Sequence, residues 1–126
     1  MTTPHKAHSP GFLALVKDAK SRIEEVDIAA YREMPRAGHL LIDVREDHEW
    51  EAAHAAGAMH LSKGIVERDI ETTFPDKATR LVLYCGGGYR SALATDNLQK
   101  MGYSNILSLD GGWRAIEASG LPIERK

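Results

Sequence analysis

The segment Arg80–Leu93, RLVLYCGGGYRSAL, places an apolar strand, a glycine turn and a helix start in direct succession. The run from Arg80 to Cys85 becomes continuously apolar after its first residue, which is typical of a short strand buried on both faces. Residues 86–88 are all glycine and permit a sharp turn. A helix is predicted from Ser91 to Met101, with Gly102 ending it. Such a strand, turn and helix in succession indicate a parallel α/β sheet.

The rest of the chain alternates short apolar runs with segments of helical periodicity. Further strands are predicted at residues 39–44, 58–61 and 106–109. Helices are predicted at residues 12–26, 27–34, 67–73 and 113–119, and a helix or turn at residues 47–56. This alternation predicts a single α/β domain with a parallel sheet covered on both faces. We expect residues 1–10 to be a flexible N-terminal tail and residues 11–126 to be the domain.

The composition is that of one globular domain without an obvious macromolecular partner. A chain of 126 residues can bury a core without disulfide staples. Its net charge of −2 gives no reason to expect nucleic-acid or membrane binding. No apolar run is long enough to span a bilayer, and the first residues lack a secretory signal, so a cytoplasmic location is expected. The six histidines have no tight ligand spacing, so no metal site is expected.

Cys85 is the only cysteine of the chain, so it cannot form an intramolecular disulfide. It ends a strand, and functional residues of parallel sheets collect at that edge, so we expect an exposed sulfur. Amides of the glycine turn and of the helix start should point toward this sulfur. Arg90 lies close in sequence and should favour the reactive thiolate. The alternative is a tight turn beside an inert cysteine.

Three segments in order resemble the rhodanese family. Residues 81–93, LVLYCGGGYRSAL, resemble its active-site segment. Residues 41–58, LIDVREDHEWEAAHAAGA, resemble its segment with Asp-Val-Arg, Glu-aromatic and Gly-His-Ile-x-Gly-Ala. Residues 109–122, LDGGWRAIEASGLP, resemble its closing Leu-x-Gly-Gly-Trp segment. Three positions depart from the family pattern, Ala53, Ala55 and Ile116.

The resemblance implies a five-stranded parallel sheet with helices on both faces and a sulfurtransferase activity. Cys85 would carry the transferred sulfur as a persulfide, taken from thiosulfate or a persulfide and passed to cyanide or a thiol. Asp43 and Arg45 would lie near the loop, either contacting substrate or forming a structural ion pair. No metal or cofactor is implied, and we expect a monomer or weak homodimer. The backbone of the loop would cradle the persulfide: Gly86, Gly87, Gly88, Tyr89 and Arg90.

The same segment can be compared with the requirements of other functions. A phosphatase or arsenate reductase of this fold needs a loop one residue longer, whereas four residues separate Cys85 from Arg90. A dinucleotide site is disfavoured because Ser91 replaces the third glycine of the fingerprint. A non-catalytic binding or redox-sensing module remains an alternative, although inactive family members typically lack the cysteine. Trp50 and Trp113 are expected to be core anchors.

Overall fold

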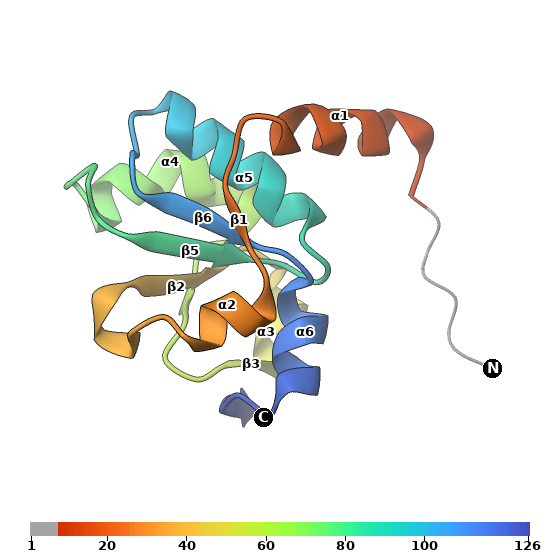
Figure 1. The fold of residues 1–126 in the computed structure, drawn as a ribbon, viewed down its shortest axis with the longest axis vertical. Helices are drawn as coiled ribbons and strands as arrows, with labels where there is room; N and C mark the ends of the chain where they lie inside the picture. Colours follow the sequence, from red (N-terminus) through yellow and green to blue (C-terminus); the bar gives the residue numbers. More distant parts are fainter. Residues whose placement is uncertain (1–7) are drawn as a thin grey trace.

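A computed structural model describes residues 8–126 and contains a central sheet of five parallel strands (Figure 1). The strand order is β1-β6-β5-β2-β4. Their bounds are β1 (Glu25–Val26), β2 (Leu40–Asp43), β4 (Met59–His60), β5 (Leu81–Tyr84) and β6 (Ile106–Leu109). β5 occupies the middle, and all four of its residues are fully buried, as its continuous apolar run predicts. The predicted five-stranded parallel sheet is confirmed.

Helices cover both faces of this sheet, as predicted (Figure 1). One face carries α1 (Pro10–Lys20), α4 (Lys63–Thr73) and α5 (Tyr89–Lys100), and the other carries α2 (Ile28–Arg32), α3 (Asp47–Ala52) and α6 (Gly112–Ser119). A short 3-10 turn, Arg36–Gly38, precedes β2. Alternate residues of β5 enter two cores: Leu83 packs with Ile70 and Leu98, and Val82 packs with Leu109 and Ile116. The middle strand therefore joins two apolar layers.

The first predicted helix is too long, because residues 25–26 form an edge strand. α1 ends at Lys20, and Ser21 is its C-cap. The backbone of Ser108 donates to Glu24, and that of Asp110 donates to Val26. Pairing with β6 thus satisfies backbone N–H and C=O groups of both strands. A helix continued over residues 25–26 could not pair with β6 in this way.

A second, two-stranded sheet was not predicted. β3 (Ala53–Ala55) pairs antiparallel with β7 (Ile123–Arg125). The predicted helix or turn over 47–56 therefore ends at Ala52, where α3 passes directly into β3. β7 is mostly exposed and has little apolar pattern, so its pairing is decided by the chain returning beside β3.

Most of the predicted N-terminal tail, residues 1–7, lies outside the described residues. Among the described residues, Ser9 is the N-cap of α1, and Pro10, the last residue of the predicted tail, is already the first residue of this helix. Across residues 8–126, no helix is long and apolar enough to cross a membrane. The same range contains no group of three or more metal-ligating side chains.

Candidate active site

The candidate site lies at the carboxyl end of the middle strand. Cys85 follows β5 directly, and the loop of residues 86–88 leads into α5. Gly88 is the N-cap of this helix and has a left-handed φ of 102°, a conformation that glycine adopts without strain. The loop therefore turns tightly enough for the start of α5 to fold back over the cysteine.

Two backbone amides point at the sulfur. The N–H groups of Gly88 and Ser91 lie 3.1 and 3.3 Å from Cys85 Sγ. The sulfur also lies 3.5 Å from the hydroxyl of Ser91, which is 2.9 Å from the hydroxyl of Ser108 on β6. Hydrogen bonds of this kind are strongest when the sulfur is anionic. The arrangement can hold a thiolate or a persulfide anion at the positive end of α5.

The expectation of an exposed sulfur is wrong, because Cys85 is only 1% exposed. The loop curls over the sulfur, and one side of the residue joins the apolar core that contains Leu83 and Ala94. The neighbouring amides nevertheless face the sulfur, which an inert core cysteine does not require. Of the five predicted cradle residues, Gly88 donates to Sγ, and Ser91, just beyond the predicted cradle, supplies the second amide.

The start of α6 packs against the backbone of Cys85 and Gly86. The amide of Trp113 donates to the carbonyl oxygen of Cys85 at 2.7 Å, and that of Arg114 donates to Gly86 at 3.2 Å. Gly112 has a φ of 50°, and a Cβ there would collide with the Cys85 carbonyl. Backbone therefore touches backbone at this point, which only glycine permits.

Arg90 lies in the first turn of α5, beside the loop, and is not a free cation. Its guanidinium donates to both carboxylate oxygens of Glu49 on α3, at 2.8 and 3.2 Å. This hydrogen bonding raises the pKa of Arg90. Burial opposes ionisation of Glu49, but the hydrogen bonds from Arg90 and from the Glu46 amide outweigh it, so the pKa of Glu49 lies below its usual value. The two residues form a charged pair beside the loop.

Asp43 and Arg45 form a buried ion pair. The Arg45 guanidinium donates to Asp43 at 2.8 Å and to the carbonyl of Ala53 at 2.6 Å. Burial works against its charge, but the bonds to Asp43 prevail and the pKa of Arg45 is raised. Its guanidinium also lies 4.7 Å from the centre of the Trp113 ring. With 0% and 3% exposure, these two residues fit the structural alternative, joining β2 to β3 and α6.

The aromatic residues have different surroundings. Trp113 packs against the core on the α6 side of the sheet, whereas Trp50 stacks with His54 and His60 at ring separations of 3.5 and 5.0 Å. Tyr89, one of the five residues of the predicted cradle, packs against His8 and Phe12. The N-terminal end of the described chain thus covers part of the loop.

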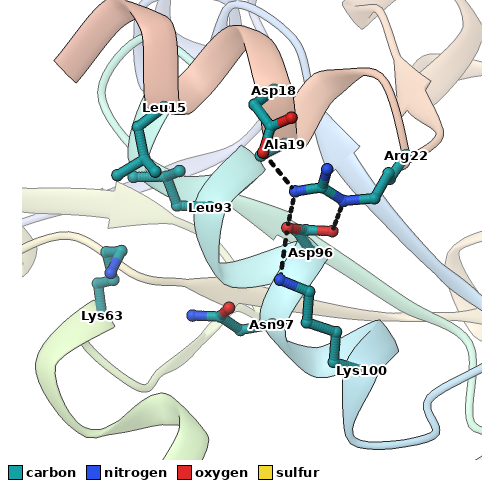
Figure 2. A pocket seen from close by; sticks show the side chains of 9 residues that line it. All are labelled: Leu15, Asp18, Ala19, Arg22, Lys63, Leu93, Asp96, Asn97 and Lys100. Atoms are coloured by element: carbon teal, nitrogen blue, oxygen red, sulfur yellow. Dashed lines mark hydrogen bonds and ion pairs between the residues drawn. The ribbon is translucent and has the colours of Figure 1, made fainter. Parts of the chain in front are cut away.

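A separate hollow lies between α1, α4 and α5 (Figure 2). Its charged lining includes Arg22, Asp96 and Lys100, which are joined by ion pairs. None of its lining residues belongs to the loop of residues 85–91. The hollow therefore plays no part in the site built around the sulfur.

The sequence patterns gave no individual role to Glu49, to the hydroxyls of Ser91 and Ser108, or to Gly112. A serine inside the apolar run ILSL of β6 was the available signal for Ser108. Glu49 follows Glu46 by three residues, which is capping-box spacing, and the structure forms that box. The contacts that give these residues their importance come from other elements, so no local pattern could assign them.

Comparison with known proteins places the chain in a family. A family model described as Rhodanese-like domain matches residues 17–119. Thiosulfate sulfurtransferase GlpE of Pseudomonas entomophila is 36% identical over 81 residues, covering 62% of this chain and 72% of the relative. Among solved structures, a protein of unknown function from Rhodopseudomonas palustris, described as a possible tyrosine phosphatase, matches with a TM-score of 0.82 and 28% identity, covering 96% of this chain and 99% of that one.

A second solved structure is similar over nearly as much of the chain. The polysulfide-sulfur transferase homodimer of Wolinella succinogenes has a TM-score of 0.76 and 28% identity, covering 92% of this chain and 88% of that one. Relatives named as thiosulfate sulfurtransferases support the predicted enzyme class, a rhodanese-type sulfurtransferase. Because the family model spans most of the sequence, including the cysteine loop and all five strands of the parallel sheet, the chain belongs to the rhodanese-like domain family.

Proposed function

We propose that the protein transfers a sulfane sulfur through a persulfide on Cys85. The observation that supports this most directly is the pair of amides, from Gly88 and Ser91, that point at the sulfur. A buried cysteine in an apolar core has no need of two amide donors. An anionic sulfur at that position gains from both hydrogen bonds and from the start of α5.

The proposed reaction has two balanced half-reactions. In the first, the Cys85 thiolate attacks the outer sulfur of thiosulfate, a sulfur–sulfur bond forms, and sulfite leaves with the electron pair of the bond that breaks. In the second, cyanide or a thiolate attacks the terminal sulfur of the persulfide. Thiocyanate or a new persulfide departs, and the Cys85 thiolate is restored. A persulfide donor would enter the first step in the same way, with a thiolate as leaving group.

The other predicted residues receive roles from their contacts. The backbone from Gly86 to Arg90 shapes the turn around the persulfide, and Gly88 starts the helix. Asp43 and Arg45 hold β2 against its neighbours, and we assign them an organising role without substrate contact. Because Cys85 is almost completely covered, the loop has to open slightly for a donor to reach the sulfur.

A phosphatase is the second candidate, since a solved relative is described as a possible tyrosine phosphatase. The loop argues against it, because only four residues separate Cys85 from Arg90. In addition, the guanidinium of Arg90 is occupied by Glu49. A non-catalytic binding or redox-sensing module would keep the fold without transferring sulfur.

The test is a persulfide measurement on the intact protein. We expect incubation with thiosulfate to add one sulfur atom, detected by intact mass and removed by cyanide or dithiothreitol. Cys85→Ala should gain nothing, because Cys85 is the only cysteine. Hydrolysis of a chromogenic phosphate ester without any persulfide would support the phosphatase instead. Absence of both reactions would support the non-catalytic module.

We also propose that the protein acts in the cytoplasm as a monomer or weak homodimer, without nucleic-acid or membrane partners. The net charge of −2 supports the absence of polyanionic partners. One relative is named as a homodimer, so the oligomeric state is measured directly by sedimentation over a range of protein concentrations.

A further inference from the structure

We infer that Glu49 determines which sulfur donors the site accepts, by cancelling the charge of Arg90 so that a singly charged donor is favoured over the thiosulfate dianion. This inference rests on the proposed persulfide function and adds a specificity-determining residue to it. Glu49 acts through Arg90 and does not touch the sulfur.

The geometry makes Glu49 and Arg90 a single charged unit. The two terminal nitrogens of the Arg90 guanidinium each donate to one carboxylate oxygen of Glu49, at 2.8 and 3.2 Å, and the side chains of Arg90 and Glu49 are only 30% and 26% exposed. Two parallel hydrogen bonds fix the orientation of a guanidinium as well as its charge. Partial burial also protects the pair from screening by salt. The guanidinium of Arg90 is therefore held against Glu49 of α3 and is not free to turn fully toward an incoming anion.

The pair lies close enough to the sulfur to influence the charge there. A Cβ on Gly86, the residue after the cysteine, would be 3.2 Å from a guanidinium nitrogen of Arg90. The charge of the Cys85 thiolate itself contributes to the raised pKa of Arg90. A carboxylate directly behind that guanidinium is thus within electrostatic reach of a donor at the sulfur.

Two further cations near the loop are also paired with acids. Arg45 is paired with Asp43, and Lys20, which lies over the Tyr89 ring, is paired with Glu25. With these three cations paired, the groups of the described residues that face the sulfur are the two amides on Sγ and the positive end of α5, equivalent to about half an elementary charge. This partial positive charge suits the single negative charge of a persulfide or of a singly charged donor. It leaves the second charge of thiosulfate uncompensated.

The experiment compares two donors that differ by one charge. Thiosulfate and methanethiosulfonate both offer a terminal sulfur on an oxidised sulfur atom, but a methyl group in the second replaces a charged oxygen. Each transfers that sulfur to the Cys85 thiolate, releasing sulfite or methanesulfinate. The measured quantity is the ratio of kcat/KM for thiosulfate to kcat/KM for methanethiosulfonate, with cyanide as acceptor. Comparing this ratio between variants cancels the difference in leaving group.

Glu49→Gln should raise this ratio about fivefold, because it removes one negative charge several ångströms from the reacting anion. Glutamine keeps an oxygen that can accept from Arg90 and from the Glu46 amide, so α3 retains its cap. The increase should shrink at high ionic strength. Glu51→Gln removes the same charge from the same helix at an exposed position, and it should change the ratio by less than about twofold.

A double variant separates charge from structure. Glu49→Gln with Arg90→Gln has no net charge at the pair, as in the natural protein, so its ratio should return toward the natural value. A ratio that stays unchanged in Glu49→Gln, or that rises equally in Glu51→Gln, overturns the inference while persulfide formation stands. If neither donor loads Cys85 in the natural protein, the proposed function fails and the inference fails with it.

Discussion

At the scale of single residues, Gly112 shows how closely the loop and α6 approach each other. A Cβ at this position would meet the carbonyl oxygen of Cys85 and lie 3.0 Å from the carbonyl carbons of Cys85 and Gly86. The opposing atoms are backbone, so they cannot rotate away as a side chain could. We expect Gly112→Ala to displace the cysteine loop, lowering kcat/KM for sulfur transfer by at least about tenfold. The free energy of unfolding should fall by roughly 1–3 kcal/mol.

Gly120 provides the matched control for Gly112. It also has a positive φ, 80°, but a Cβ there would meet nothing within 4 Å. Gly120→Ala should therefore show the cost of backbone strain alone, with sulfur transfer unchanged. Steady-state kinetics and urea unfolding distinguish the two variants. Equal activity in both would show that contact between α6 and the loop does not position the cysteine.

At the scale of elements, α1 is attached to α5 by an apolar contact and by an ion pair. Val16 and Ala19 are the buried residues of α1. Just after the helix, the guanidinium of Arg22 donates to both oxygens of Asp96 on α5, at 3.0 and 2.8 Å (Figure 2). Asp96 also receives Lys100 at 3.4 Å. The Asp96 side chain is only 6% exposed, so this pair is shielded from water on one side.

Replacing Asp96 by asparagine should weaken the docking of α1. Asparagine keeps the shape but loses the charge that Arg22 and Lys100 meet, and we expect a loss of roughly 1–3 kcal/mol in the free energy of unfolding at pH 7. Asp18 binds the same arginine but is 62% exposed, so Asp18→Asn should lower the free energy of unfolding much less than Asp96→Asn does. Urea unfolding measures both values. Equal losses would mean that burial of Asp96 adds nothing to the pair.

At the scale of the whole molecule, acid should loosen contacts between elements. Hydrogen bonds from Arg22 hold the pKa of Asp96 below its ordinary 3.8, and the pKa of Glu49 lies below its ordinary 4.5 although burial opposes its ionisation. Both carboxylates stay ionised in the folded chain at pH values where the unfolded chain binds protons. Their contribution to stability is therefore complete above about pH 5 and is lost as the pH falls through the lowered values.

We expect the free energy of unfolding to decrease between about pH 5 and pH 2. Asp96→Asn combined with Glu49→Gln should flatten this decrease, since neither residue can then bind a proton. Urea unfolding followed by circular dichroism at several pH values provides the measurement. A double variant with the same pH slope as the natural protein would assign acid sensitivity to other carboxylates.

Sequence alone determined four strands of the parallel sheet, most of the helices around it and the position of the cysteine. Continuous apolar runs such as Leu81–Tyr84 encode buried parallel strands, because every residue of such a strand faces a covering layer. The glycines after Cys85 encode a turn, because glycine readily adopts conformations that most other residues avoid, such as the positive φ of Gly88. These signals are local in the chain, so they survive without any knowledge of the fold.

Tertiary structure alone decided the exposure and the electrostatics of the site. The burial of Cys85, the pairing of Arg90 with Glu49 and the collision that requires Gly112 each depend on residues far apart in sequence. The same holds for β1 and β7, whose short segments become strands only beside β6 and β3. Contacts of this kind arise when separate elements pack together, and their strength depends on distance and burial that no local pattern encodes.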